Sequence, residues 1–130
     1  MEAYRIGMNI EILDSLYAVC KISAANAIPD WAAGDFVSLT VTDQEYSLVT
    51  PQHSVPEGVE CQRDWRAFRI SGTLDFSLIG IISRITGILA DAAVPVFVLS
   101  TFDTDYFLVP NELAEIAQQQ LREFGYTFCR

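Results

Sequence analysis

The order of apolar patterns between Trp65 and Cys129 constrains the fold more than any other feature of this sequence. Residues 65–70 alternate between two faces, as a strand with one buried face does. Apolar residues then recur three and four positions apart from Leu78 to Leu89, which predicts an amphipathic helix with Asp75 as its N-cap. Pro95 excludes a continuation of that helix. A strand followed by a helix is therefore expected over residues 65–92.

Two short apolar runs follow and predict a hairpin. Residues 96–99 and 106–109 have the β-branched and aromatic composition of buried strands, and residues 101–104 form the break between them. A second amphipathic helix is expected after Asn111, a good N-cap, and before Gly125 as its C-cap. Residues 126–128 then form a final short strand.

The predicted order from residue 65 to residue 129 is β-α-β-β-α-β, which is typical of the ferredoxin-like arrangement. Such a unit has an antiparallel four-stranded sheet with both helices on one face. The sequence therefore predicts an α+β fold class, with one complete domain over residues 63–130.

The first half of the chain repeats part of this order. Residues 8–13 and 16–22 look like strands, residues 29–32 like a helical turn, and residues 36–41 and 46–49 like a hairpin. Residues 51–60 are expected to be a connector or one short helical turn. Because a second helix is missing from the pattern, residues 1–62 are interpreted as a degenerate lobe of the same kind.

Composition excludes several classes of function. The chain of 130 residues has 8 basic and 17 acidic residues, a net charge of −9, which disfavours nucleic acid as a partner. No apolar stretch reaches the length of a membrane span, and the N-terminus lacks the pattern of a secretory signal, so we expect a cytoplasmic protein. Three cysteines without paired spacing and one histidine predict neither a zinc site nor a disulfide framework. No cofactor is expected.

Enzymatic activity is not expected either. His53 and Cys61 are accompanied by no nucleophile motif, and His53 is interpreted as a connector residue. Asp103 and Asp105 share one strand face, but no opposing reactive centre is evident for acid-base catalysis. Trp31 and Trp65 are interpreted as core anchors rather than ligand platforms.

Two loops are candidates for binding a small molecule. Residues 72–82 lead into the first helix, where free backbone NH groups can hold a carboxylate. Residues 100–106 combine hydroxyl groups, carboxylates and an aromatic ring, which can receive an ammonium or guanidinium group. The plainer alternatives remain open: Gly72 serves a turn, Gly80 packs against the sheet, and the second loop is a solvated turn.

The same loops carry a resemblance to a known family. The sequence resembles the ACT-domain group that includes the CASTOR arginine sensors and small bacterial tandem-ACT proteins, over roughly residues 65–121. The matching segments are Leu74-Asp75-Phe76, Gly80-Ile81-Ile82, Leu89-Ala90 and, above all, the run from Leu99 to Val109. Upstream, Ile28-Pro29-Asp30-Trp31 and Glu45-Tyr46-Ser47-Leu48-Val49 resemble the first repeat of the bacterial proteins.

The resemblance implies a non-catalytic regulatory protein that holds an amino-acid-like effector between ACT units. It implies ligand contacts from two groups of residues: Asp75, Phe76, Ser77, Leu78, Ile79 and Gly80 in the first loop, and Thr101, Phe102 and Asp105 in the second. The arginine sensors have four ACT units and this chain has room for two, so a homodimer is expected to supply the others. The alternative hypothesis is a structural or adaptor module that dimerises through its ACT sheet and binds no ligand.

Overall fold

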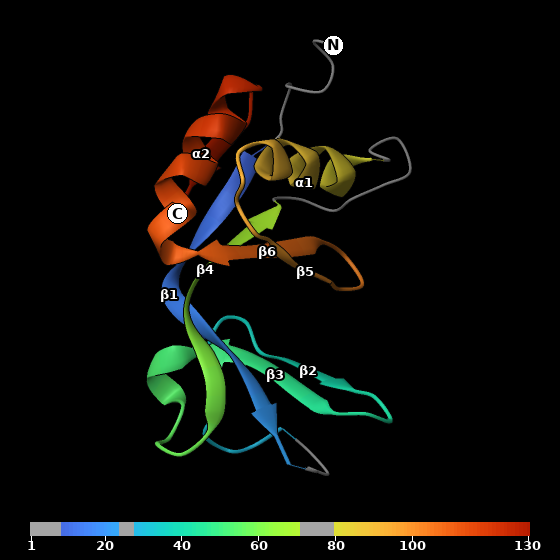
Figure 1. Ribbon diagram of the computed structural model, residues 1–130, viewed down its shortest axis with the longest axis vertical. Coiled ribbons are helices and arrows are strands. Elements are labelled where there is room, and N and C mark those ends of the chain that lie inside the picture. The colour runs from blue at the N-terminus through green and yellow to red at the C-terminus, as the bar shows by residue number, and fades with distance from the viewer. Residues whose placement is uncertain (1–8, 24–27, 71–79) are drawn as a thin grey trace. The chain divides into compact units, whose positions relative to one another are not determined.

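Two compact units make up the chain. The computed structural model describes residues 9–23, 28–70 and 80–130 (Figure 1). One unit, here called the helical unit, contains the chain up to Asp14 and Arg66–Arg130. The other, here called the strand unit, is Ser15–Trp65. Residues 9–14, assigned from sequence to the first lobe, thus group with the C-terminal half of the chain. None of the helices in the described part is long and apolar enough to cross a membrane.

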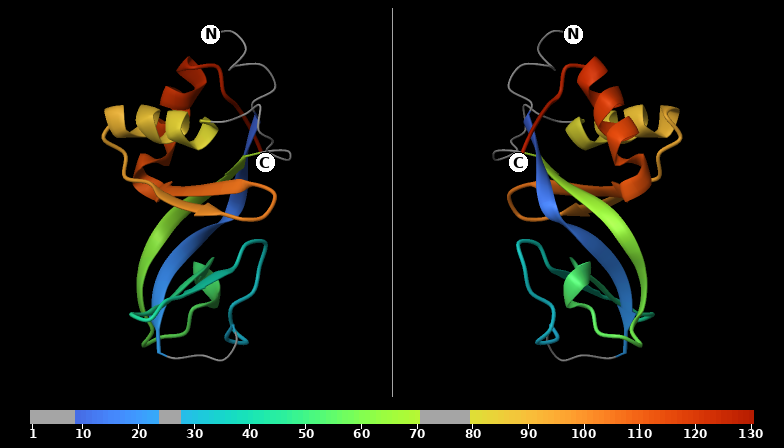
Figure 2. Two further views of the ribbon diagram at one scale, coloured as in Figure 1. Left: turned by 90° about the vertical axis from the view of Figure 1, so that its right-hand side faces the viewer. Right: turned by 90° about the vertical axis from the view of Figure 1, so that its left-hand side faces the viewer.

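The helical unit is a sheet with two helices. Its hydrogen-bonded strands follow the order β7-β1-β4-β6-β5, and Figure 2 shows α1 and α2 beside each other. The elements are β1 (Asn9–Ile22), β4 (Glu60–Ile70), α1 (Ile81–Asp91), β5 (Phe97–Ser100), β6 (Asp105–Pro110), α2 (Ala114–Glu123) and β7 (Thr127–Cys129). From β4 onward the order is β-α-β-β-α-β. The predicted α+β class is confirmed.

The pairing of β7 departs from the antiparallel four-stranded sheet expected from sequence. Strand β1 lies between β7 and β4, and β7 runs parallel to β1 with Asn9 opposite Thr127. Side chains secure this pair, because Thr127 Oγ1 donates to Asn9 Oδ1 at 3.1 Å. The added strand brings Ile10 and Ile12 into the core. Burial of these side chains is the physical reason for the fifth strand.

The core of the helical unit lies between the helices and the sheet. Phe68 of β4 and Phe107 of β6 are fully buried, and their rings stack with centroids 5.0 Å apart. From α1 come Ile85, Ile88 and Leu89, three members of the apolar face predicted from the sequence. The helices therefore bury the faces that the 3.6-residue period indicates.

The ends of the helices differ in part from the predictions. Helix α1 is described from Ile81, and Gly80 precedes it with φ of +87°; the predicted cap Asp75 lies outside the described residues. Asn111 is not the N-cap of α2, since it begins a 3-10 turn, η4 (Asn111–Leu113), and its Oδ1 accepts a hydrogen bond from Arg66 Nε. Gly125 follows α2 with φ of +97°, and its NH bonds to Arg122 O at 2.9 Å. The predicted glycine stop is thus present, one residue beyond Phe124.

The strand unit is built on the second part of β1. It contains the antiparallel hairpin of β2 (Ser38–Val41) and β3 (Tyr46–Pro51), as predicted, and a 3-10 turn η2 (Gln52–Ser54). β3 pairs with residues 17–22 of β1. The two strands expected at 8–13 and 16–22 are one continuous strand of 14 residues. The unit has its own buried cluster: Ala18, Cys20, Leu48 and Val55.

Candidate functional site

The β5–β6 turn carries three of the predicted ligand contacts. Thr101 and Phe102 lie in the turn, and Asp105 is the first residue of β6. Gly80 stands directly before α1. The other five predicted contacts, Asp75, Phe76, Ser77, Leu78 and Ile79, lie outside the described residues. The structure therefore brings together the second group of predicted residues and describes only Gly80 of the first.

Threonine side chains hold the turn in a fixed conformation. The NH of Thr101 donates to Thr104 O at 2.8 Å, and the Thr101 hydroxyl donates to the same oxygen at 3.1 Å. In return the NH of Thr104 donates to Thr101 Oγ1 at 3.3 Å. This reciprocal bonding is how Ser and Thr side chains commonly fix turns. The two hypotheses for this segment, a turn and a ligand-binding loop, are thus compatible. Polar groups that the ordered turn does not use for its own hydrogen bonds can still bind a ligand.

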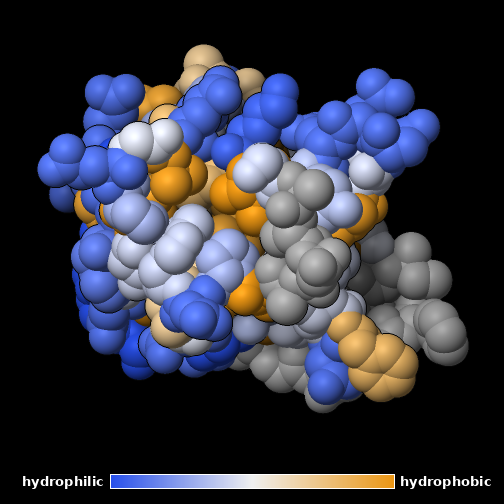
Figure 3. Space-filling model, turned by 90° about the horizontal axis from the view of Figure 1, so that it is seen from below, coloured by the Kyte–Doolittle hydropathy of each residue, from blue (hydrophilic) through white to orange (hydrophobic). Residues whose placement is uncertain are grey.

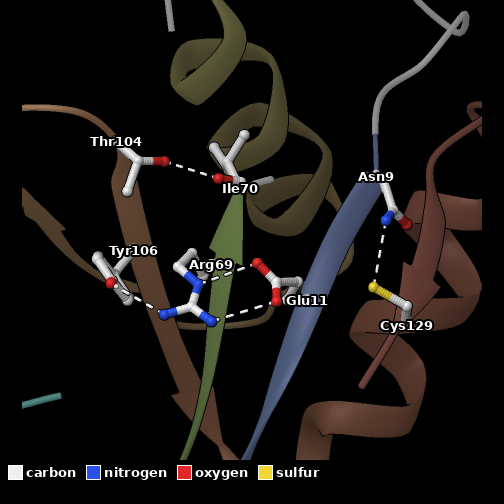
Figure 4. Close-up of polar contacts among 7 residues, drawn as sticks. All are labelled: Asn9, Glu11, Arg69, Ile70, Thr104, Tyr106 and Cys129. Atoms are coloured by element: carbon white, nitrogen blue, oxygen red, sulfur yellow. Dashed lines mark hydrogen bonds and ion pairs between the residues drawn. The ribbon is translucent and has the colours of Figure 1, made fainter. Parts of the chain in front are cut away.

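A hydrogen bond ties this turn to the end of β4. The hydroxyl of Thr104 donates to the backbone oxygen of Ile70, the last residue of β4, at 2.7 Å (Figure 4). The turn therefore lies at the C-terminal end of β4, the point from which the chain leads toward residues 71–80. The β5–β6 turn thus meets Ile70 in this part of the helical unit.

The carboxylate of Asp105 lies at the start of β6, directly after the turn. It is half-buried, and its Oδ1 accepts a short hydrogen bond from Ser100 Oγ, its cross-strand neighbour. The hydroxyl orients one oxygen of the carboxylate. A carboxylate that accepts such a bond keeps lone pairs for another donor, so Asp105 can bind a cationic group.

Arg69 does not compete for Asp105, because another carboxylate holds it. Its Nε and Nη2 donate to the two oxygens of Glu11 at 3.0 and 3.2 Å, and its Nη1 donates to Tyr106 Oη at 3.3 Å (Figure 4). These hydrogen bonds, the one to Glu11 first, raise the pKa of Arg69. Sequence reasoning missed this arrangement, since residues 11 and 69 are far apart in the chain and nothing local links them.

Phe102 is the most exposed aromatic ring among the described residues. Its relative exposure is 102%, so the ring is as open to solvent as in an extended chain. Because the Phe102 ring is fully exposed, a ligand or a second protein can cover it without breaking apolar contacts of the described fold. Covering it is favourable by the hydrophobic effect.

The strand unit carries a pocket that the sequence did not reveal. It has a volume of about 450 Å³ and is lined by both apolar and charged residues, Lys21, Trp31 and Glu60 among them. Trp31 is half-buried and packs against the buried cluster of the unit, as expected for a core anchor. It also lines the pocket. Within the described ranges, no three His, Cys, Asp or Glu residues lie close enough to hold a metal ion.

Family models match both halves of the chain. Residues 60–123 match the model of the ACT domain, and residues 15–58 match a model described as an N-terminal domain. A comparison of the sequence with curated proteins gives no significant match.

Solved structures extend the comparison to the whole chain. Protein Atu0741 from Agobacterium tumefaciens is 33% identical and superposes with a TM-score of 0.87, over 94% of this chain and 92% of that one. VC0802 from Vibrio cholerae, of unknown function, is 20% identical with a TM-score of 0.76, over 91% and 90%. The regulatory subunit of aspartate kinase from Thermus thermophilus, in its ligand-free form, is 11% identical with a TM-score of 0.60, over 88% and 95%. The last two similarities concern the fold.

These findings define the chain as an α+β protein with an ACT domain in its C-terminal half, in a fold shared with the regulatory subunits of aspartate kinase. It belongs to the same family as Atu0741.

Proposed function

We propose that this chain is a non-catalytic regulatory protein that binds an amino acid or a similar small molecule at the β5–β6 turn of its helical unit. One observation carries the proposal. The Thr104–Ile70 hydrogen bond holds an ordered polar turn at the C-terminal end of β4. Asp105 receives the ammonium group of the ligand, and Phe102 covers its apolar part.

Electrostatics support this role for Asp105. Arg69 is paired with Glu11 at 3.0 Å, so its positive charge is balanced by that carboxylate. The Asp105 carboxylate is oriented by a neutral hydroxyl, which leaves its charge available. A charge-assisted hydrogen bond to an ammonium group is about twice as strong as a neutral one.

The fold supports a regulatory role. Aspartate kinase places the same fold in its regulatory subunit, and an ACT domain model covers residues 60–123 of this chain. The contributions of Asp75, Phe76, Ser77, Leu78, Ile79 and Gly80 stay predictions, as does the ACT-like origin of residues 1–62.

A thermal-shift screen of the common amino acids tests the proposal. An amino acid present at about 100 times its dissociation constant stabilises the folded protein by roughly 2.7 kcal/mol, which raises the melting temperature. Asp105→Asn removes the charge but keeps an oxygen that accepts from Ser100, so the fold is preserved and the shift is lost. Asp103→Asn makes the same change of charge at an exposed position of the same turn and keeps the shift.

Two results contradict the proposal. If no amino acid shifts the melting temperature of the unaltered protein, the adaptor alternative, a dimerisation module without a ligand, replaces it. If Asp105→Asn responds like Asp103→Asn, Asp105 is not the ligand contact.

Assembly as a homodimer is part of the same proposal. Strand β5 ends the order of the described strands, and its Val98 is exposed, so the strand presents an edge to which a second copy can add. Val98→Lys places like charges opposite each other in a two-fold pair and converts the dimer to monomer. Ile116→Lys on α2, an equally exposed apolar position, leaves the dimer intact. Sedimentation velocity distinguishes the variants, and a wild-type monomer at micromolar concentration contradicts the dimer.

A further inference from the structure

The pocket of the strand unit has the size of a small-molecule site. Its volume is about 450 Å³, within the range of roughly 300–1,000 Å³ typical of ligand pockets. All of its lining residues belong to Ser15–Trp65, so it shares none with the β5–β6 turn. The function proposed above leaves it without a role.

Part of the pocket lining is apolar and packs against the interior of the strand unit. Ile22, Trp31 and Val59 belong to this part and pack against the buried cluster of the strand unit. The turn that carries Trp31 is closed by the bond from Ala32 N to Pro29 O at 3.0 Å. Figure 3 shows the surface of the molecule from below, where patches of hydrophobic residues, in orange, lie among hydrophilic residues, in blue. Trp31 is therefore a half-buried aromatic residue of the lining, against which an apolar group can pack.

The pocket lining also includes one charge of each sign. Lys21 at the end of β1 and Glu60 at the start of β4 both line the pocket, and both are exposed. Lys21 is the only lysine in the sequence. Within the described ranges, the side chain of Lys21 forms no ion pair or hydrogen bond, whereas every described arginine has a partner: Arg63, Arg66, Arg69, Arg84, Arg122 and Arg130.

We propose that this pocket is a second binding site, specific for a small zwitterion with an apolar body, of the class of leucine or phenylalanine. Lys21 binds the carboxylate, Glu60 binds the ammonium group, and Trp31 packs on the apolar part. The charges of the chain select this class. A net charge of −9 repels an anion, whereas a zwitterion carries no net charge and is not repelled. A simple cation pairs with Glu60 but leaves Lys21 without a counter-charge.

Tryptophan fluorescence tests the proposal directly. The chain has two tryptophans, so in a Trp65→Phe background the emission comes from Trp31 alone. L-Leucine and L-phenylalanine are expected to change this emission in a saturable way. Phenethylamine, which lacks the carboxylate, and hydrocinnamate, which lacks the ammonium group, are expected to bind at least about tenfold more weakly, because each leaves one charge of the pocket unmatched.

Variants identify the two charged contacts. In the same background, Lys21→Met and Glu60→Gln are each expected to weaken binding of L-phenylalanine by roughly tenfold or more. Glu57→Gln is the matched control, since Glu57 is exposed in the turn that precedes β4 and does not line the pocket. Asp105→Asn is also expected to leave this binding unchanged, which separates this site from the one proposed at the β5–β6 turn.

The unaltered chain offers a second measurement. Selective ¹³C-lysine labelling yields the signal of a single side chain, Lys21, and its ε-methylene resonance is expected to move on addition of L-phenylalanine but not of phenethylamine. The proposal is overturned if neither amino acid changes the emission of Trp31 or the Lys21 resonance. It is equally overturned if Lys21→Met and Glu60→Gln bind as tightly as Glu57→Gln.

Discussion

Arg69 of β4 donates hydrogen bonds to both carboxylate oxygens of Glu11 in β1, at 3.0 and 3.2 Å, and so connects two residues that are 58 positions apart in the sequence. The two side chains are about one-third exposed, at 31% and 32%. A second ion pair, Arg130 with Asp14, is 63% and 85% exposed and measures 3.4 Å. Because the Arg69–Glu11 pair is bidentate and less exposed, it is expected to contribute more to the free energy of unfolding than the Arg130–Asp14 pair.

Removing the first pair is expected to lower stability measurably. Glu11→Gln loses one charge of a bidentate, partly buried pair and should reduce the free energy of unfolding by about 1 kcal/mol. Asp14→Asn, the control, breaks the exposed pair and should change it by about 0–0.5 kcal/mol. Urea unfolding followed by circular dichroism measures both, and equal effects would mean that the bidentate geometry adds nothing.

Helix α2 provides a matched test of the core of the helical unit. Leu121 is fully buried against the sheet, whereas Ile116 on the same helix is 44% exposed. Leu121→Ala should lower the free energy of unfolding by about 2–5 kcal/mol, because it removes buried methyl groups and leaves a cavity. Ile116→Ala should lower it by no more than about 0.5 kcal/mol. Thermal unfolding ranks the two, and a reversed order would place α2 with its other face inward.

The Thr104–Ile70 bond is expected to matter both for stability and for the ligand. Thr104→Val keeps the shape of the side chain but leaves the Ile70 oxygen without its hydroxyl donor, at a cost of about 1 kcal/mol. Thr104→Ser restores the donor and most of the stability. If the turn forms the ligand site, amino-acid-induced thermal shifts should be smaller in Thr104→Val than in Thr104→Ser; equal shifts would remove the turn from the site.

Stability is expected to fall at alkaline pH, partly through Cys20. Burial, and then the neighbouring Cys61 thiol, raise the pKa of Cys20 from 9.0 to about 11. Between these values the unfolded chain loses the proton while the folded chain keeps it, so the unfolded state is favoured as pH rises. The stabilising effect is complete below pH 9 and is lost up to about pH 11, with a slope of at most about 1.4 kcal/mol per pH unit.

Burial also raises the pKa of Tyr126. This shift lowers stability at alkaline pH as well, so its effect must be distinguished from that of Cys20. The experiment measures unfolding free energy against pH for the wild type, Cys20→Ala and Tyr126→Phe. The readout is the slope above pH 9, which is independent of the constant cost of each substitution. Cys20→Ala should flatten it, and an unchanged slope would show that the Cys20 thiol does not titrate differently in the folded and unfolded states.

Local pattern determined most of the element order. The period of two residues identifies β4 and the period of 3.6 residues identifies α1 and α2, because each of these elements must bury one face whatever it packs against. The apolar, aromatic composition of residues 106–109 identifies β6, which is buried along most of its length. Gly125 marks the end of α2, since a positive φ is easy for glycine. The prediction that Asn111 caps α2 was wrong, because its side-chain oxygen instead accepts a hydrogen bond from Arg66, a residue 45 positions away.

The sequence by itself determined the α+β class, the β-α-β-β-α-β order and the polar turn at residues 101–105, because these follow from the burial of faces and from turn chemistry within short segments. Only the tertiary structure decided that β1 lies between β4 and β7, that Arg69 bonds Glu11, and that Lys21 and Glu60 share one pocket with Trp31. Each of these brings together residues far apart in the chain. Their pairing depends on which strands become neighbours, and that choice depends on the burial of the whole sheet rather than on any local pattern.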